Sequence, residues 1–212
     1  PAAAATVRPA ADEHRVRVRH VRTRARARVH RDDRTRRAVA WRVRTLRAPA
    51  LDARNLATAT AHDCTDCHAV ALSVQVVVAG RNERRVEAGN LAVAVTDECV
   101  RCTSVALAYQ FVVVRPGRLV LTRQARRDLA DLRRQMRDVA RHRVGQDLVA
   151  QEDALAEKVA DVLRSGVVDR DREKHRRGEP STYLGQGSGS GGTAVAVRVR
   201  RAHDTARGRA DR

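Results

Sequence analysis

Residues 55–78 read NLATATAHDCTDCHAVALSVQVVV, and residues 90–113 read NLAVAVTDECVRCTSVALAYQFVV. The two segments align without a gap at an offset of 35, and 12 of their 24 positions are identical. Both cysteine pairs fall in phase, Cys64 on Cys99 and Cys67 on Cys102. Two unrelated Ala/Val-rich segments would rarely agree to this extent. The centre of the chain is therefore a tandem duplication in which each copy carries one CxxC motif.

Each copy indicates a short strand, a corner at the CxxC motif and a second apolar element. The copies span residues 55–80 and 90–117, and a polar link joins them. Periodicity leaves the second element open between strand and helix, because short apolar runs are ambiguous. Before the copies, residues 23–47 alternate apolar residues with Arg around Asp32 and Asp33. This pattern predicts a β-hairpin with the two aspartates in its turn.

After the copies the period changes from two to that of a helix. Thr122 is a plausible N-cap residue, and two apolar stripes separated by Val144-Gly145 predict an antiparallel helical hairpin over residues 122–164. The stripes consist of Ala125, Leu129, Leu132, Met136 and Val139, and of Leu148, Leu155, Val159 and Val162.

These elements predict an α+β fold: a small antiparallel sheet with two CxxC corners, covered by the C-terminal helical hairpin. We expect one domain over residues 23–168. Residues 1–22 are expected to form a disordered Arg/Ala-rich leader, and residues 169–212 a charged, Gly/Ser-rich disordered tail. The chain starts at Pro1, so we expect that the natural N-terminus precedes it, and a signal peptide is neither seen nor excluded.

Composition limits both the core and the partners. Aromatic residues make up 2% of the chain, so Val, Ala and Leu must form the interior. The net charge of +18 is uneven: +11 in residues 1–50, +2 in 51–165 and +5 in 166–212. Only two of the 43 basic residues are Lys, and Trp41 is the one aromatic in the Arg-rich part, so base stacking has little support and nucleic-acid binding is disfavoured. The longest apolar runs, 69–80 and 103–114, are too short to span a membrane.

The paired cysteines leave four interpretations open. Cys64, Cys67, Cys99 and Cys102 could form disulfides in an oxidising compartment, or a four-thiolate zinc site. A thiol–disulfide exchange site is a third, weaker reading. Cys64, Cys67 and His68 also form CxxCH, the pattern of c-type haem attachment. Thr103 replaces the histidine in the second copy, which argues against haem.

Other residues give weaker signals. Asn55, Asn90, Gln75 and Gln110 recur in both copies and are expected to make structural hydrogen bonds inside the fold. No HExxH, GxSxG, GxGxxG or phosphate-loop motif is present, so no catalytic residue is assigned.

The duplicated pattern resembles a domain of actinobacterial proteins. Asn-Leu-Ala-x-Ala followed by CTDC in one copy and by CVRC with Ala108–Phe111 in the other carries this resemblance, which extends over about two-thirds of the chain. Those proteins are labelled hypothetical secreted proteins or peptide zinc metalloproteases. The resemblance implies export and therefore disulfides. It transfers no protease residue, because the HExxH helix is missing.

We therefore expect a non-catalytic, exported structural or interaction module stabilised by its cysteines, with no cofactor. The partner is not identified; the helical hairpin is expected to cover the sheet, and a protein partner at the hairpin is the alternative. The alternatives are a four-cysteine zinc domain, or an accessory domain of a zinc metalloprotease system, and an Arg-mediated binder of nucleic acid or an anionic surface.

Overall fold

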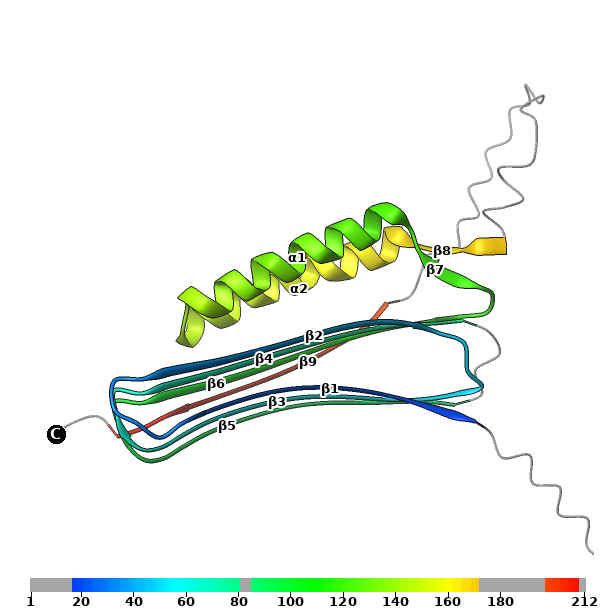
Figure 1. The fold of residues 1–212 in the computed structure, drawn as a ribbon. Coiled ribbons are helices and arrows are strands. Elements are labelled where there is room, and N and C mark those ends of the chain that lie inside the picture. Colours follow the sequence, from blue (N-terminus) through cyan, green and yellow to red (C-terminus); the bar gives the residue numbers. More distant parts are fainter. Residues whose placement is uncertain (1–16, 81–84, 172–196, 210–212) are drawn as a thin grey trace, which may run out of the picture.

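The computed structural model describes residues 17–80, 85–171 and 197–209, which build three layers: a lower sheet, a middle sheet and a pair of helices (Figure 1). Sheet A contains β1 (Val18–Val29), β3 (Ala50–Thr65) and β5 (Arg85–Val100). Sheet B contains β2 (Thr35–Leu46), β4 (His68–Gly80), β6 (Thr103–Arg115) and β9 (Val197–Arg207). The helices are α1 (Arg123–His142) and α2 (Gly145–Gly166).

The strands stack in parallel and in register, so that the duplicated segments lie side by side. Asn55 is paired with Asn90 and Cys64 with Cys99 in sheet A, and Gln75 is paired with Gln110 in sheet B. The N-terminal residues add a third pair of strands to this stack, with β1 parallel to β3 and β2 parallel to β4. The chain therefore winds as a β-solenoid of three coils: coil 1 (18–46), coil 2 (50–80) and coil 3 (85–115).

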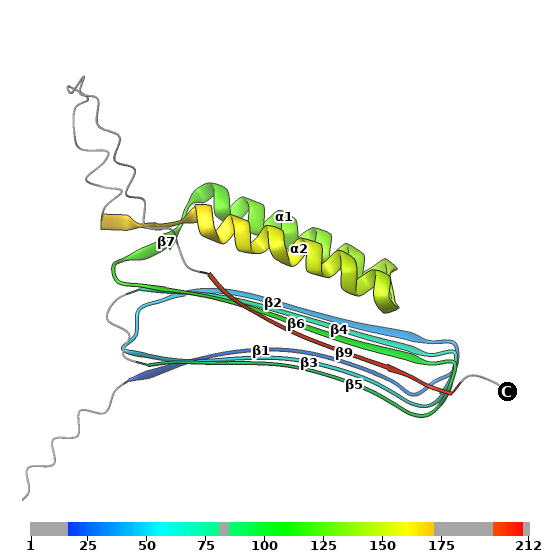
Figure 2. The same cartoon turned by 180° about the vertical axis from the view of Figure 1, so that it is seen from behind.

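This architecture overturns the predicted α+β fold with a small antiparallel sheet. Nine strands and only two helices form the described part of the chain, and the strands of the coils are parallel. The predicted hairpin at 23–47 is also wrong, because β1 and β2 belong to different sheets and face each other across the interior (Figures 1 and 2). The reason is the repeat itself: each strand finds its best-matched hydrogen-bonding partner one repeat away, rather than in its chain neighbour.

The core explains why β4 and β6 were ambiguous in the sequence. Both faces of each strand are buried, so successive side chains alternate between small and large rather than between polar and apolar. Small residues such as Ala71 and Ala106 face sheet A, whereas Leu72, Leu107 and Phe111 face the helices. Alanine rows let the two sheets approach closely, and the larger side chains need the helices as a cover.

The helical hairpin forms at the predicted place. The Thr122 hydroxyl accepts a hydrogen bond from the backbone N–H of Ala125 and caps α1. The apolar stripes of both helices are buried against sheet B. A short antiparallel pair, β7 (Leu119–Leu121) and β8 (Val167–Asp169), joins the base of the hairpin. No helix among the described residues is long and apolar enough to cross a membrane.

The last strand corrects the expectation of a disordered tail over residues 169–212. Residues 197–207 form β9, which pairs antiparallel with β6 and covers the edge of coil 3 in sheet B. Residues 18–22 of the expected disordered leader likewise belong to β1. The remaining leader residues, 1–16, and the Gly/Ser-rich stretch within 172–196 lie outside the described residues.

Candidate functional site: a buried cysteine corner

The four cysteines meet at one corner of the solenoid, where sheet A turns into sheet B. Cys64 and Cys99 lie near the ends of β3 and β5, and Cys67 and Cys102 directly precede β4 and β6. In-register stacking places each cysteine beside its counterpart in the next coil. All four side chains are buried among alanines of the inter-sheet core.

The sulfur atoms form a compact cluster. Cys64 and Cys67 form a disulfide with a Cα–Cα distance of 6.2 Å, and Cys99 and Cys102 are free thiols. The Sγ–Sγ distance is 3.7 Å from Cys64 to Cys99, 3.9 Å from Cys67 to Cys99 and 4.0 Å from Cys64 to Cys102. Cys67 and Cys102 are closer, at 2.9 Å. This cluster could form disulfides or hold a metal ion.

The turns achieve their shape without glycine inside the CxxC motifs. Asp66 and Arg101 occupy the left-handed region with φ of 54° and 53°, as Asp33 does in coil 1 at 52°. The guanidinium of Arg101 donates two hydrogen bonds to the Asp66 carboxylate, at 2.8 and 2.6 Å. These bonds hold the pKa of Asp66 below its usual value. The stacked ion pair therefore ties the strained turns of coils 2 and 3 together.

The C-terminal segment closes the corner from the far side of coil 3. The backbone N–H of Gly208 donates to the carbonyl of Cys102, and that of Arg209 donates to the carbonyl of Cys99, both at 3.0 Å. A Cβ atom at position 208 would lie 2.6 Å from the carbonyl oxygen of Cys99, so only glycine fits this approach. Both CxxC motifs are thus enclosed by protein on either side, with coil 1 next to coil 2 and residues 208–209 next to coil 3.

The environment of Cys102 disfavours nucleophilic chemistry. Burial, with a hydrogen bond to Cys99, raises the pKa of the Cys102 thiol to about 11. A reactive cysteine needs a depressed pKa, commonly from a helix N-terminus or a nearby cation. Both CxxC motifs instead join two strands, so no helix dipole acts on them.

The remaining residues singled out in the sequence occupy two places. His68 begins β4 and is not part of the four-cysteine cluster. The repeated amides form two ladders in the interior. The Asn55 amide donates to the Asn90 side chain at 2.9 Å, and the Gln110 amide donates to the Gln75 side chain at 2.8 Å.

Sequence reasoning missed a second group of potential ligands at the outer side of the same corner. His62, Asp63 and Glu98 bring their ligand atoms within 4.8 Å of one another. A hydrogen bond with Asp63, and its negative charge, raise the pKa of Glu98. The repeat offset could have predicted this group, because an offset of 35 places Asp63 next to Glu98 and His62 next to Asp97.

The fold and the corner define the class of this protein as a three-coil β-solenoid with a stacked pair of CxxC turns and a helical cover. Comparison with protein-family models, with curated proteins and with solved structures found no match.

Proposed function

We propose that the chain is a non-catalytic, exported interaction module whose cysteine corner stabilises the turn between the two sheets. The carrying observation is the burial of all four sulfur atoms in one closed corner, with the Cys102 thiol protonated at neutral pH. Burial limits the access of substrates to such thiols, and a disulfide there is typical of an oxidising compartment.

The outer face of sheet A supports the role in interaction. Sheet B is covered by the helices, whereas sheet A has no covering layer among the described residues (Figures 1 and 2). Leu91 and Val95 point outward from β5 and are 55% and 42% exposed. The apolar stripes of the helical hairpin, by contrast, are buried on sheet B, so a partner at the hairpin would meet its polar side.

The test is the oxidation state of the cysteines. The full chain is unfolded and alkylated without reductant, and its mass is compared with that of reduced and alkylated protein. We expect Cys64 and Cys67 to remain unlabelled before reduction and all four cysteines to be labelled after it. Labelling of all four without reductant, in protein recovered from an oxidising compartment, would remove the disulfide role.

The stability lost when cysteines are substituted distinguishes a disulfide within one CxxC motif from a disulfide between two coils. A disulfide within one CxxC closes a loop of four residues and is worth about 2 kcal/mol, whereas a bond between coils closes a loop of about 35 residues and is worth about 4 kcal/mol. We expect Cys64→Ala with Cys67→Ala to lower the free energy of unfolding by about the smaller amount, plus the cost of lost packing. An unchanged Tm together with the loss of a measurable reaction would contradict a non-catalytic role.

A structural zinc site is the second candidate, and three of the four inter-coil distances support it. Four thiolates around zinc, at Zn–S distances of about 2.3 Å, lie about 3.8 Å from one another. Three of the four Sγ–Sγ distances between coils, 3.7, 3.9 and 4.0 Å, are close to that value, whereas the fourth, from Cys67 to Cys102, is shorter at 2.9 Å. Stoichiometric zinc in protein purified under reducing conditions, lost on substitution of Cys99 and Cys102, would establish this candidate in place of the first.

A further inference from the structure

At the coil 1 end, where no further strand pairs with β2 among the described residues, β2 carries arginine at three positions where coil 2 carries core residues. Arg36, Arg42 and Arg44 of β2 pair with Ala69, Gln75 and Val77 of β4, whose side chains are fully buried between the sheets. In coil 1 the arginines occupy the same inward register on an edge strand and are exposed. Arg36, Arg42 and Arg44 thus lie on the inward side of this edge, with Ala38 and Ala40 between Arg36 and Arg42.

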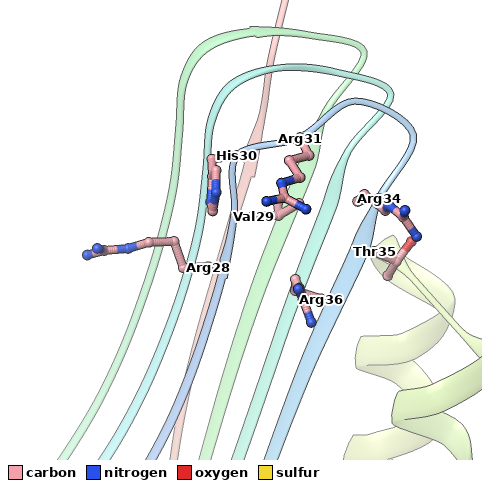
Figure 3. A pocket seen from close by; sticks show the side chains of 7 residues that line it. All are labelled: Arg28, Val29, His30, Arg31, Arg34, Thr35 and Arg36. Carbon is pink, nitrogen blue, oxygen red and sulfur yellow. The ribbon is translucent and has the colours of Figure 1, made fainter.

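These arginines line two pockets at the edge of coil 1. A pocket of 310 Å³ lies at the turn from β1 to β2 and is lined by Arg28, Val29, His30, Arg31, Arg34, Thr35 and Arg36. Figure 3 shows Arg31, Arg34 and Arg36 around this turn, with Arg28 extending to one side. A pocket of 530 Å³ lies toward the other end of the strands and is lined by Arg19, His20, Val21, Arg22, Arg42, Arg44, Thr45, Leu46 and Arg47.

The charge of coil 1 is only partly neutralised by the described residues around it, among them Asp32 and Asp33 in the turn and Asp52 beside His20. Residues 17–47 contain 13 Arg and two Asp, whereas residues 50–80 contain one Arg and three Asp. No aspartate or glutamate lines either pocket. Such an excess repels a second copy of the same edge and attracts anions.

The lining also limits the chemistry of the ligand. Guanidinium groups bind phosphate in a bidentate manner. The two pockets contain no aromatic side chain for stacking on a base except the imidazoles of His20 and His30, and no Asn or Gln that could read a base edge. The lining therefore favours a ligand recognised through its phosphates, because guanine is the one base whose edge the lining arginines themselves could read.

The spacing indicates a chain rather than a single anion. Val21 and Val29 line different pockets and are eight residues apart on β1, which corresponds to about 26 Å in an extended strand. We propose that the edge of coil 1 binds a linear inorganic polyphosphate chain that reaches from one pocket to the other. This ligand assignment is independent of the cysteine chemistry, so failure of either proposal leaves the other intact.

The experiment compares long-chain polyphosphate with tripolyphosphate on the full chain at equal phosphate concentration. Because tripolyphosphate can fill only one pocket, we expect the long chain to bind at least about 100-fold more tightly, with an affinity that falls steeply with salt. Oligothymidylate of similar length and heparin are the competing polyanions. Equal affinity for tripolyphosphate and the long chain, or tighter binding of oligothymidylate or heparin than of polyphosphate, would overturn the proposal.

Three variants test the location. In the first, Arg36→Ala, Arg42→Gln and Arg44→Val copy the residues of coil 2. In the second, Arg28, Arg31 and Arg34 become Gln; these side chains are exposed, so the core is untouched. The control changes the exposed Arg123, Arg127 and Arg133 of α1 to Gln and removes the same charge. We expect each coil 1 variant to lose at least tenfold in affinity and the control less than threefold. Equal losses in all three would mean that net charge, and not this edge, binds the polymer.

Discussion

Glu152 is the residue whose placement is least favourable in the described structure. It lies in α2 with a fully buried side chain, and neither carboxylate oxygen has a hydrogen-bond partner. Burial, with the neighbouring charge of Asp153, raises the pKa of Glu152 to about 9. Asp153 itself is engaged, because it accepts a hydrogen bond from the Tyr109 hydroxyl and pairs with His203. Glu152 is therefore protonated in the folded chain at neutral pH.

This pKa predicts a pH-dependent cost. The folded state holds a proton that the unfolded state releases above its usual pKa near 4.5, so stability falls as pH rises from about 4.5 to about 9. We expect Glu152→Gln to increase the free energy of unfolding by about 1–3 kcal/mol at pH 7 and to have little effect at pH 4. Urea unfolding of both proteins at pH 7 and pH 4 measures this difference in the free energy of unfolding. A gain of the same size at pH 4 would show that ionisation is not the cause.

At the scale of elements, β9 is the strand that completes the solenoid. It pairs with β6 in sheet B and also reaches β5 at the edge of sheet A through two bonds. The Asn90 amide donates to the carbonyl of Arg200 at 2.9 Å, and the Asp204 carboxylate accepts from the backbone N–H of Ala94 at 2.8 Å. One strand therefore satisfies edge groups of both sheets at the coil 3 end.

The Asp204 contact can be tested by a matched pair of substitutions. Asp204→Ala removes the acceptor of the part-buried Ala94 N–H and should cost about 1–2 kcal/mol, whereas Asp204→Asn keeps an oxygen acceptor and should cost less than half of that. Chemical denaturation gives both values. If Asn is as destabilising as Ala, the carboxylate acts through its charge rather than through this hydrogen bond.

The elements also show how far the sequence could be interpreted. The duplication, the CxxC corners and both helices could be predicted from the sequence, because the two copies align without a gap and the apolar stripes of the helices have regular spacing. The parallel sheets were not predicted, although a repeat of 35 residues is itself a sign of stacked coils. The sequence left β4 and β6 open between strand and helix because both faces of these strands are buried. Coil 1 was not recognised as a further copy because Arg42 and Thr23 replace the repeated Gln75 and Asn55. The closing role of β9 depends on contacts with residues about 100 positions earlier, which no local pattern reveals.

At the scale of the whole molecule, stability should vary along the stack of coils. Coil 2 has a hydrogen-bonded neighbour on each side, whereas β1 and β2 have one neighbour each among the described residues. Side-chain hydrogen bonds also connect successive coils, from Thr23 in coil 1 through Gln75 in coil 2 to Gln110 in coil 3. Solenoids behave as nearly one-dimensional arrays in which an end unit opens before the middle.

Hydrogen exchange measures this gradient. We expect amides of β4 to exchange at least about 100-fold more slowly than amides of β2, because opening coil 1 disrupts one interface and opening coil 2 disrupts two. Long-chain polyphosphate should narrow the difference by slowing β2. Equal protection of β2 and β4 in the unbound chain would instead mean that another strand covers the edge of coil 1 in solution.

The in-register stacking of coils 2 and 3 has a consequence for how such a chain can change in length. The strand pairing between coil 2 and coil 3 joins like positions throughout, so a further copy of residues 50–84 spliced between them would keep the same strand register. Both ends, one rich in arginine and one sealed by the returning strand, would be left as they are. Growth by whole multiples of 35 residues thus keeps the register, while an insertion of another length within a strand would put the cysteines or the ladder amides out of register.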